Sequence, residues 1–194
     1  KRGLLFTKAY CSAPGCNASR SSLLTGLRPS TTGIYANAHD WRQAPKLSGA
    51  VTLPRHFRNN GYLTLGTGKL FHAHTFFGKK NLNGYPDPEA WADYFPSKTQ
   101  QMPEEAVPEN WPVNSSRKFY GGHFDWPPLQ IPNAGMADAK VVSWANKQLA
   151  KQHEQPLFLS VGIYRPHVPW YVPQKYFDRF PLEEIQLPKN LSDD

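Results

Sequence analysis

The fold is decided by residues 52–69, whose sequence is Thr-Leu-Pro-Arg-His-Phe-Arg-Asn-Asn-Gly-Tyr-Leu-Thr-Leu-Gly-Thr-Gly-Lys. The first ten residues predict a helix, because Thr52 can cap its start, Pro54 suits its first turn and Gly61 suits its end. Residues 62–69 predict a strand that runs into a tight, glycine-containing loop. A helix joined directly to a strand is the repeating unit of folds built on a parallel sheet.

A second helix and strand lie further along the chain. Residues 136–153 predict a helix that places Val141, Trp144, Ala145 and Leu149 on one apolar face. Residues 157–163, Leu-Phe-Leu-Ser-Val-Gly-Ile, form an apolar run that is typical of a central buried strand.

The remaining segments extend this pattern. Residues 4–10 are short, apolar and aromatic and predict a strand, and residues 19–27 predict a helix that ends before Pro29. The order strand, helix, strand, helix, strand favours an α/β fold with a largely parallel central sheet flanked by helices. Residues 71–133 lack periodicity and are rich in proline, glycine and tryptophan, which indicates an irregular segment that builds a binding surface.

The composition limits the classes of function. The 194 residues, 39% hydrophobic and 19% charged, are typical of one globular domain. The 22 Lys and Arg exceed the 15 Asp and Glu, and the net charge of +7 favours an anionic partner. No run of Lys and Arg is longer than two residues, which argues against nucleic acid. No stretch approaches the roughly 18 apolar residues that a membrane helix requires.

A motif near the N-terminus carries the chemistry. Residues 16–26 have the sequence Cys-Asn-Ala-Ser-Arg-Ser-Ser-Leu-Leu-Thr-Gly. Cys16 precedes the predicted helix, whose first backbone N–H groups favour negative charge beside it. Arg20 lies one helical turn further on and offers a fixed cationic fork. A buried core thiol is the ordinary alternative for Cys16. Cys11, which has Gly15 four places on, is interpreted as a buried thiol or a partner near the motif.

The motif resembles the signature of the type I, formylglycine-dependent sulfatases. The resemblance implies that a formylglycine-generating or sulfatase-maturing enzyme oxidises Cys16 to an aldehyde, whose hydrate attacks the sulfur of a sulfate ester. The commoner family pattern has proline where this chain has Ala18. The resemblance to the sulfatases also implies an alkaline-phosphatase/sulfatase-like fold. Asn17-Ala18-Ser19 matches the glycan acceptor pattern, but its place beside Cys16 indicates a coincidence.

A second cluster follows the predicted strand at 62–69, where active sites of α/β sheets gather. Gly68-Lys69 is followed by His72. Taken alone, Lys69 would be interpreted as a surface charge and His72 as a loop histidine. The same sulfatase resemblance implies that Lys69 contacts the sulfate and that His72 contacts the formylglycine hydrate and assists the release of sulfate.

A third cluster follows the apolar run at 157–163. His167 lies in a loop stiffened by Pro166 and Pro169. It resembles the family histidine that binds the sulfate ester and protonates the leaving alcohol; a structural histidine is the alternative. Together with the His72 region, Tyr35 and Trp41, this loop most resembles the iduronate-2-sulfatase branch of the family. The implied substrate is a sulfated sugar.

The resemblance also implies one divalent cation, usually Ca²⁺, with the hydrate formed from Cys16 among its ligands. The family's carboxylate pairs have no counterpart here: the first would precede Lys1 and the later one would follow Asp194, so most metal ligands are expected outside this chain. The chain is therefore interpreted as an internal fragment of an N-terminal catalytic domain, residues 1–194. The family suggests a periplasmic, secreted or lysosomal location.

Two alternatives remain open from the sequence. The first is another specificity of the same superfamily: a choline or aryl sulfatase, or a phosphonate or phosphodiester hydrolase. The second is a truncated or inactive sulfatase-like domain that binds sulfated glycans through its positive charge.

Overall fold

The computed structural model describes residues 3–72, 75–76, 79–80, 87–97, 107–114 and 124–187. The chain divides into two compact units, one formed by residues 1–102 and 141–163 and the other by residues 103–140 and 164–194. Each unit is described by itself. Among the described residues, no helix has the length and apolar character needed to cross a membrane.

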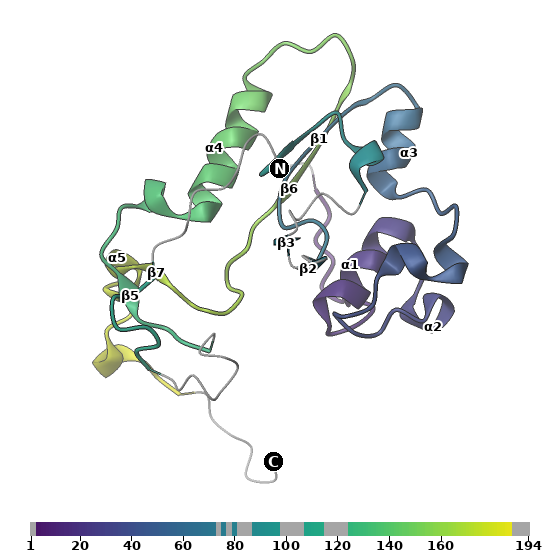
Figure 1. Ribbon diagram of the computed structural model, residues 1–194. Helices are drawn as coiled ribbons and strands as arrows, with labels where there is room; N and C mark the ends of the chain where they lie inside the picture. The colour runs from purple at the N-terminus through teal and green to yellow at the C-terminus, as the bar shows by residue number, and fades with distance from the viewer. Residues whose placement is uncertain are drawn as a thin grey trace. The chain divides into compact units, whose positions relative to one another are not determined.

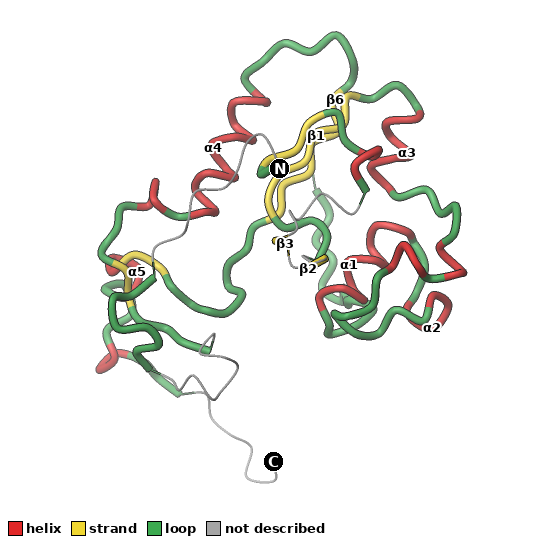
Figure 2. Tube along the Cα trace, in the orientation of Figure 1, coloured by secondary structure: helices red, strands yellow, loops and turns green. Residues whose placement is uncertain are grey.

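The first unit is built on a three-stranded parallel sheet in the order β4-β1-β6. β1 spans Leu63–Gly68, β4 spans Asp93–Phe95 and β6 spans Leu157–Gly162. Gly68 of β1 lies opposite Gly162 of β6. Figure 2 shows β1 and β6 side by side, and Figure 1 shows α3 and α4 on opposite sides of them. The predicted parallel sheet flanked by helices is confirmed.

Among the described residues of the first unit, four helices pack around this sheet. They are α1 (Cys16–Thr25), α2 (Pro29–Thr32), α3 (Leu53–Asn59) and the C-terminal part of α4 (Ala137–Leu149). Short 3₁₀ turns lie at Trp41–Gln43, Pro45–Leu47 and Pro88–Ala90, and β2 (Thr75–Phe76) pairs antiparallel with β3 (Lys79–Lys80).

The N-terminus of α3 matches its sequence signals. The Thr52 hydroxyl accepts a hydrogen bond from the backbone N–H of Arg55, and Pro54 occupies the first turn. The core of this unit lies between α1, the loop that follows it and β4. It consists of Leu24, Ile34, Trp41, Ala44, Leu47, Phe71, Ala90, Trp91 and Tyr94.

Four local predictions were wrong or incomplete. Residues 4–10 form no strand and their apolar side chains are exposed, because an apolar run becomes a strand only where a neighbouring strand receives its hydrogen bonds. β6 is a half-buried edge strand of the described sheet, not a central one. Leu149 is 61% exposed, since α4 ends there. The short strand β4 lies within the segment that was predicted to be irregular.

The second unit holds the parallel pair β5 (Pro128–Leu129) and β7 (Val172–Pro173), with α5 (Gln174–Phe177) directly after β7. The first residues of α4 also belong to it. Its small core consists of Leu129, Met136 and Tyr171, against which Trp111, Ile131, Ala139 and Val172 pack.

Candidate active site

Cys16 is the first residue of α1. The helix was predicted to begin near residue 19, but it begins three residues earlier, with Gly15 as its N-cap in an extended conformation. The side chain of Cys16 is half-buried and carries a free thiol. Cys16 therefore lies at the positive end of the helix dipole, where a developing negative charge is stabilised. Cys11 is exposed, so its interpretation as a buried thiol was wrong.

Asn17 fixes the start of α1. Its backbone N–H donates to Oδ1 of Asn37 at 3.0 Å, and its Nδ2 donates to the carbonyl oxygens of Ala36 at 3.0 Å and His39 at 2.7 Å. The residue is 1% exposed. A buried amide with both hydrogens engaged is not a glycan acceptor, and the sequence motif gave no signal for this anchoring role.

Arg20 joins α1 to the loop after β1. It lies four residues after Cys16 and therefore on the same side of the helix. Its Nη1 donates to the carbonyl oxygens of Lys69 and Leu70, the second at 3.0 Å. The guanidinium is thus held at the end of β1.

Lys69 is the first residue after β1 and is 8% exposed. Its backbone N–H donates to the Gly162 carbonyl at 2.9 Å, and the Tyr94 hydroxyl donates to the Gly68 carbonyl at 2.6 Å. Burial lowers the pKa of the Lys69 ammonium, a negative charge on Cys16 acts to raise it, and the Arg20 guanidinium lowers it. Cys16, Arg20 and Lys69 therefore form one electrostatic cluster.

His72 lies three residues beyond Lys69 and is half-buried. The preceding Phe71 is almost fully buried and stacks on Trp41, with ring centroids 5.6 Å apart. This packing fixes the backbone on the N-terminal side of His72. The residue directly before His72 is therefore anchored in the core of the first unit.

His167 belongs to the second unit and is exposed. Its Nδ1 lies 2.7 Å from the carbonyl oxygen of Val168. A carbonyl oxygen only accepts hydrogen bonds, so Nδ1 carries the hydrogen of this bond. The structure brings Cys16, Arg20 and Lys69 together within the first unit, whereas His167 lies in the second unit.

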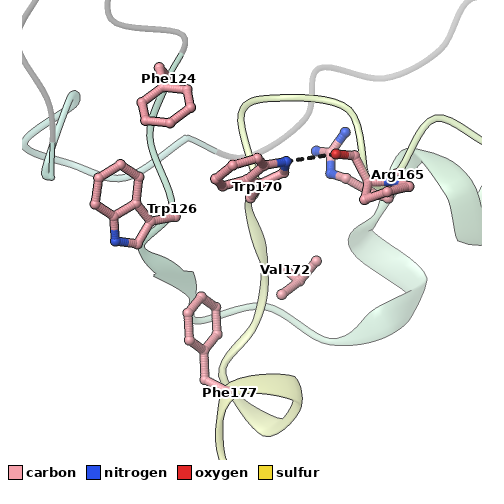
Figure 3. A pocket seen from close by; sticks show the side chains of 7 residues that line it. Phe124, Trp126, Arg165, Trp170, Val172 and Phe177 are labelled. Carbon is pink, nitrogen blue, oxygen red and sulfur yellow. Dashed lines mark hydrogen bonds between the residues drawn. The ribbon is translucent and has the colours of Figure 1, made fainter. Parts of the chain in front are cut away.

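An aromatic pocket lies in the second unit next to the loop of His167. Its volume is about 620 Å³, and Figure 3 shows the rings of Trp126, Trp170 and Phe177 around it. Phe124 packs edge-on against Trp170, with ring centroids 5.3 Å apart, and Arg165 is the charged residue in the lining. The sequence showed the density of aromatic residues, but it did not show that they gather around one space.

Asp125 supports the same part of the second unit. It is fully buried, and its carboxylate accepts hydrogen bonds from the backbone N–H groups of Val113 at 2.9 Å and Asn114 at 2.7 Å and from the Tyr171 hydroxyl at 2.9 Å. Burial acts to raise the pKa of Asp125, but these hydrogen bonds favour the carboxylate more strongly and hold the pKa below its ordinary value.

This lowered pKa predicts a loss of stability in acid. An unfolded aspartate has a pKa of about 3.9, so the stabilisation by Asp125 is complete above that pH and is lost as the pH falls through the lower folded pKa. We expect Asp125→Asn to cost about 1–3 kcal/mol at pH 7, because its amide faces a backbone donor. The difference in thermal midpoint between wild type and variant should shrink towards pH 3. A difference that grows in acid would contradict this prediction. Asp178→Asn, at an exposed carboxylate of the same unit, is the control.

The described residues do not form the implied Ca²⁺ site. Among them, no three His, Cys, Asp or Glu side chains lie close enough together to hold a metal ion. The two charged side chains beside Cys16 are those of Arg20 and Lys69, and both are cationic. A calcium ion needs several oxygen ligands, and the two cations of this cluster suit the anionic part of a substrate.

Comparison with known proteins adds a family to this geometry. The sulfatase family model matches residues 1–192. A protein described as a sulfatase from Formosa agariphila is 40% identical over 99% of this chain and 38% of its own length. Human iduronate 2-sulfatase is 32% identical over 95% of this chain and 32% of its own length. The choline-sulfatase of Rhizobium meliloti is 27% identical over 93% of this chain and 34% of its own length. The chain thus spans about a third of the length of these relatives, and it belongs to the sulfatase family.

Proposed function

We propose that the protein of which this chain is a part hydrolyses sulfate esters of a sugar, with residue 16 as the nucleophile. The observation that supports this most directly is the cluster of Cys16, Arg20 and Lys69 at the N-terminus of α1 and the end of β1. A sulfate group carries its charge on several oxygens, and a helix N-terminus with two cations beside it stabilises that charge.

The proposed nucleophile is the hydrated aldehyde formed from Cys16 by a maturing enzyme. One of its hydroxyl groups loses its proton to solvent as its oxygen attacks the sulfur. A new S–O bond forms, and the bond from sulfur to the sugar oxygen breaks. The second hydroxyl on the same carbon then loses its proton, the C–O bond to sulfate breaks, and the aldehyde is regenerated. Water restores the hydrate. Covalent catalysis of this kind divides one difficult step into two.

The neighbouring side chains have separate roles in this proposal. Arg20, which is held against the end of β1, orients the hydrate oxygens, and Lys69 places a compact positive charge on a sulfate oxygen. His72 accepts the proton of the second hydroxyl. His167, in its doubly protonated form, donates the Nε2 proton to the departing sugar oxygen, while its Nδ1–H stays hydrogen-bonded to the Val168 carbonyl.

The low exposure of Lys69 supports its role. A desolvated ammonium interacts more strongly with an anion than an exposed one, because less water screens the pair. Lys46, an exposed residue of the same unit, lacks this burial. Family membership further implies one divalent cation, Ca²⁺, whose carboxylate ligands we place outside the described residues.

The substrate class is proposed from the relatives. The identity of 32% to human iduronate 2-sulfatase favours a sulfated uronic acid, and the net charge of +7 favours polyanionic glycans. The relation to a choline-sulfatase keeps a small cationic sulfate ester as the second candidate. The family suggests a periplasmic, secreted or lysosomal enzyme.

Turnover by the full-length protein, co-expressed with a formylglycine-generating enzyme, tests this function. The substrates are a disaccharide with a 2-sulfated uronate, choline sulfate, 4-nitrophenyl sulfate and 4-nitrophenyl phosphate. We expect hydrolysis of sulfate esters, with the highest kcat/KM for the sulfated disaccharide. Hydrolysis of the phosphate ester alone would contradict the proposal. Binding of the disaccharide without any turnover would support the inactive glycan-binding alternative instead.

A further inference from the structure

The loop that carries His167, residues 164–171, has most of its backbone donors engaged. Two of its eight residues are prolines and have no N–H. The N–H of His167 donates to the Tyr164 carbonyl at 3.0 Å, and that of Trp170 donates to the Asp125 carbonyl at 2.8 Å. Such a loop is held in one conformation by the groups that receive its N–H bonds. We call it the His167 loop.

Asp138 accepts hydrogen bonds from the backbone N–H groups of the first two residues of the His167 loop. Its Oδ1 accepts from the backbone N–H of Tyr164 at 2.8 Å, and its Oδ2 accepts from that of Arg165 at 3.1 Å. One carboxylate thus holds two consecutive peptide groups, which fixes both the position and the direction of the chain as it enters the loop. Asp138 is the second residue of α4, a helix of 13 residues, and therefore has a rigid support.

The grip of Asp138 reaches His167 in one step. Tyr164 binds the Asp138 carboxylate with its N–H and the N–H of His167 with its carbonyl oxygen. The imidazole is in turn oriented by its Nδ1 bond to Val168. A displacement of Tyr164 would therefore be passed to the imidazole through a single hydrogen bond.

The other end of the loop is closed by different residues. The Trp170 indole donates to the Pro166 carbonyl at 2.6 Å, a bond drawn in Figure 3, and Nε of Arg165 donates to the Tyr171 carbonyl at 3.2 Å. Asp125 holds the Tyr171 hydroxyl. These contacts fix where the loop ends, whereas Asp138 fixes where it begins.

We propose that Asp138 is a positioning residue that sets the place of the His167 imidazole by holding the backbone of Tyr164 and Arg165, an inference that rests on the proposed role of His167. Proton transfer requires heavy atoms about 2.6–3.2 Å apart, so a shift of about 1 Å in the loop removes most of the benefit of the acid. Asp138 acts on the reaction through His167 and not by touching the substrate.

The test compares two sulfate esters with different leaving groups. A sugar alkoxide leaves poorly and needs the proton from His167, whereas 4-nitrophenolate leaves well without it. We expect Asp138→Asn to lower kcat/KM for the sulfated disaccharide about 10- to 100-fold and that for 4-nitrophenyl sulfate less than about 3-fold, because the asparagine amide turns one acceptor into a donor that faces a backbone N–H. The ratio of the two values does not depend on the fraction of enzyme that is folded.

Two further variants separate the possible failures. His167→Gln should change the same ratio by about 100-fold or more. If it does not, the proposed role of His167 is wrong, and the role of Asp138 fails with it. If His167→Gln changes the ratio but Asp138→Asn leaves it unchanged, even with a lower thermal midpoint, Asp138 is merely structural and the inference alone is overturned. Asp178→Asn, at an exposed carboxylate that accepts from the Gln174 amide, is the matched control and should leave the ratio unchanged.

Discussion

Cys16→Ser is expected to lower kcat for sulfate ester hydrolysis by about 10⁶-fold, the scale seen when a nucleophile is lost. A serine hydroxyl can attack sulfur, but its carbon carries no second hydroxyl that could expel the sulfate. The variant should therefore transfer about one sulfate per enzyme and stop. Rapid quenching should show a burst of released alcohol, and mass spectrometry should show sulfate retained on residue 16.

The second cysteine of the chain supplies the control. Cys11 is exposed and has no arginine four places on, so Cys11→Ser should keep wild-type kcat. A Cys16→Ser enzyme that turns over repeatedly at the wild-type rate would contradict the assignment of residue 16. A large loss of kcat in Cys11→Ser, with none in Cys16→Ser, would show that Cys11 and not Cys16 supplies the nucleophile.

Gly68→Ala is expected to destabilise the protein by about 3 kcal/mol or more, through overpacking added to backbone strain. Gly68 has φ +73°, which disfavours any residue with a Cβ, and a Cβ there would lie 1.9 Å from the carbonyl oxygen of Gly162. The backbone of β1 or β6 must then move. Lys69, which bonds to the same carbonyl, would move with it, so activity should fall as well.

Gly61→Ala is the matched control for this effect. Gly61 has φ +82°, but a Cβ there meets no atom within 4 Å, so the substitution adds strain without a clash. Its cost should be about 1 kcal/mol, with little effect on kcat. Thermal unfolding should show a drop in midpoint several times larger for Gly68→Ala than for Gly61→Ala. Equal drops in the two variants would contradict the close approach of β1 to β6.

The elements with strong local signals could be predicted from the sequence. Thr52 and Pro54 marked the start of α3, and the apolar runs at 62–69 and 157–163 marked β1 and β6. The site residues of the first unit could also be found from the sequence. Cys16 and Arg20 lie four residues apart, and Gly68-Lys69 come at the end of a predicted strand. Each of these signals depends on residues close together in the sequence, so it can be recognised without knowledge of long-range contacts.

The predictions that failed depend on long-range partners. Residues 4–10 have a composition suited to a strand, but the described sheet ends at β4 and β6 and gives them no neighbour. Asn17 acts through Ala36, Asn37 and His39, about twenty residues away, so its anchoring role has no signature in the motif. Asp138 binds Tyr164 and Arg165 across a similar distance in sequence.

The oxidation state of residue 16 tests the central claim most directly. Trypsin releases residues 9–20 as one peptide that holds both cysteines, so Cys11 serves as an internal reference. Fragmentation of this peptide from the full-length protein, purified from a host that matures sulfatases, should locate an aldehyde or its hydrate at residue 16 and an unmodified thiol at residue 11. Recovery of a thiol alone at residue 16 would contradict the account.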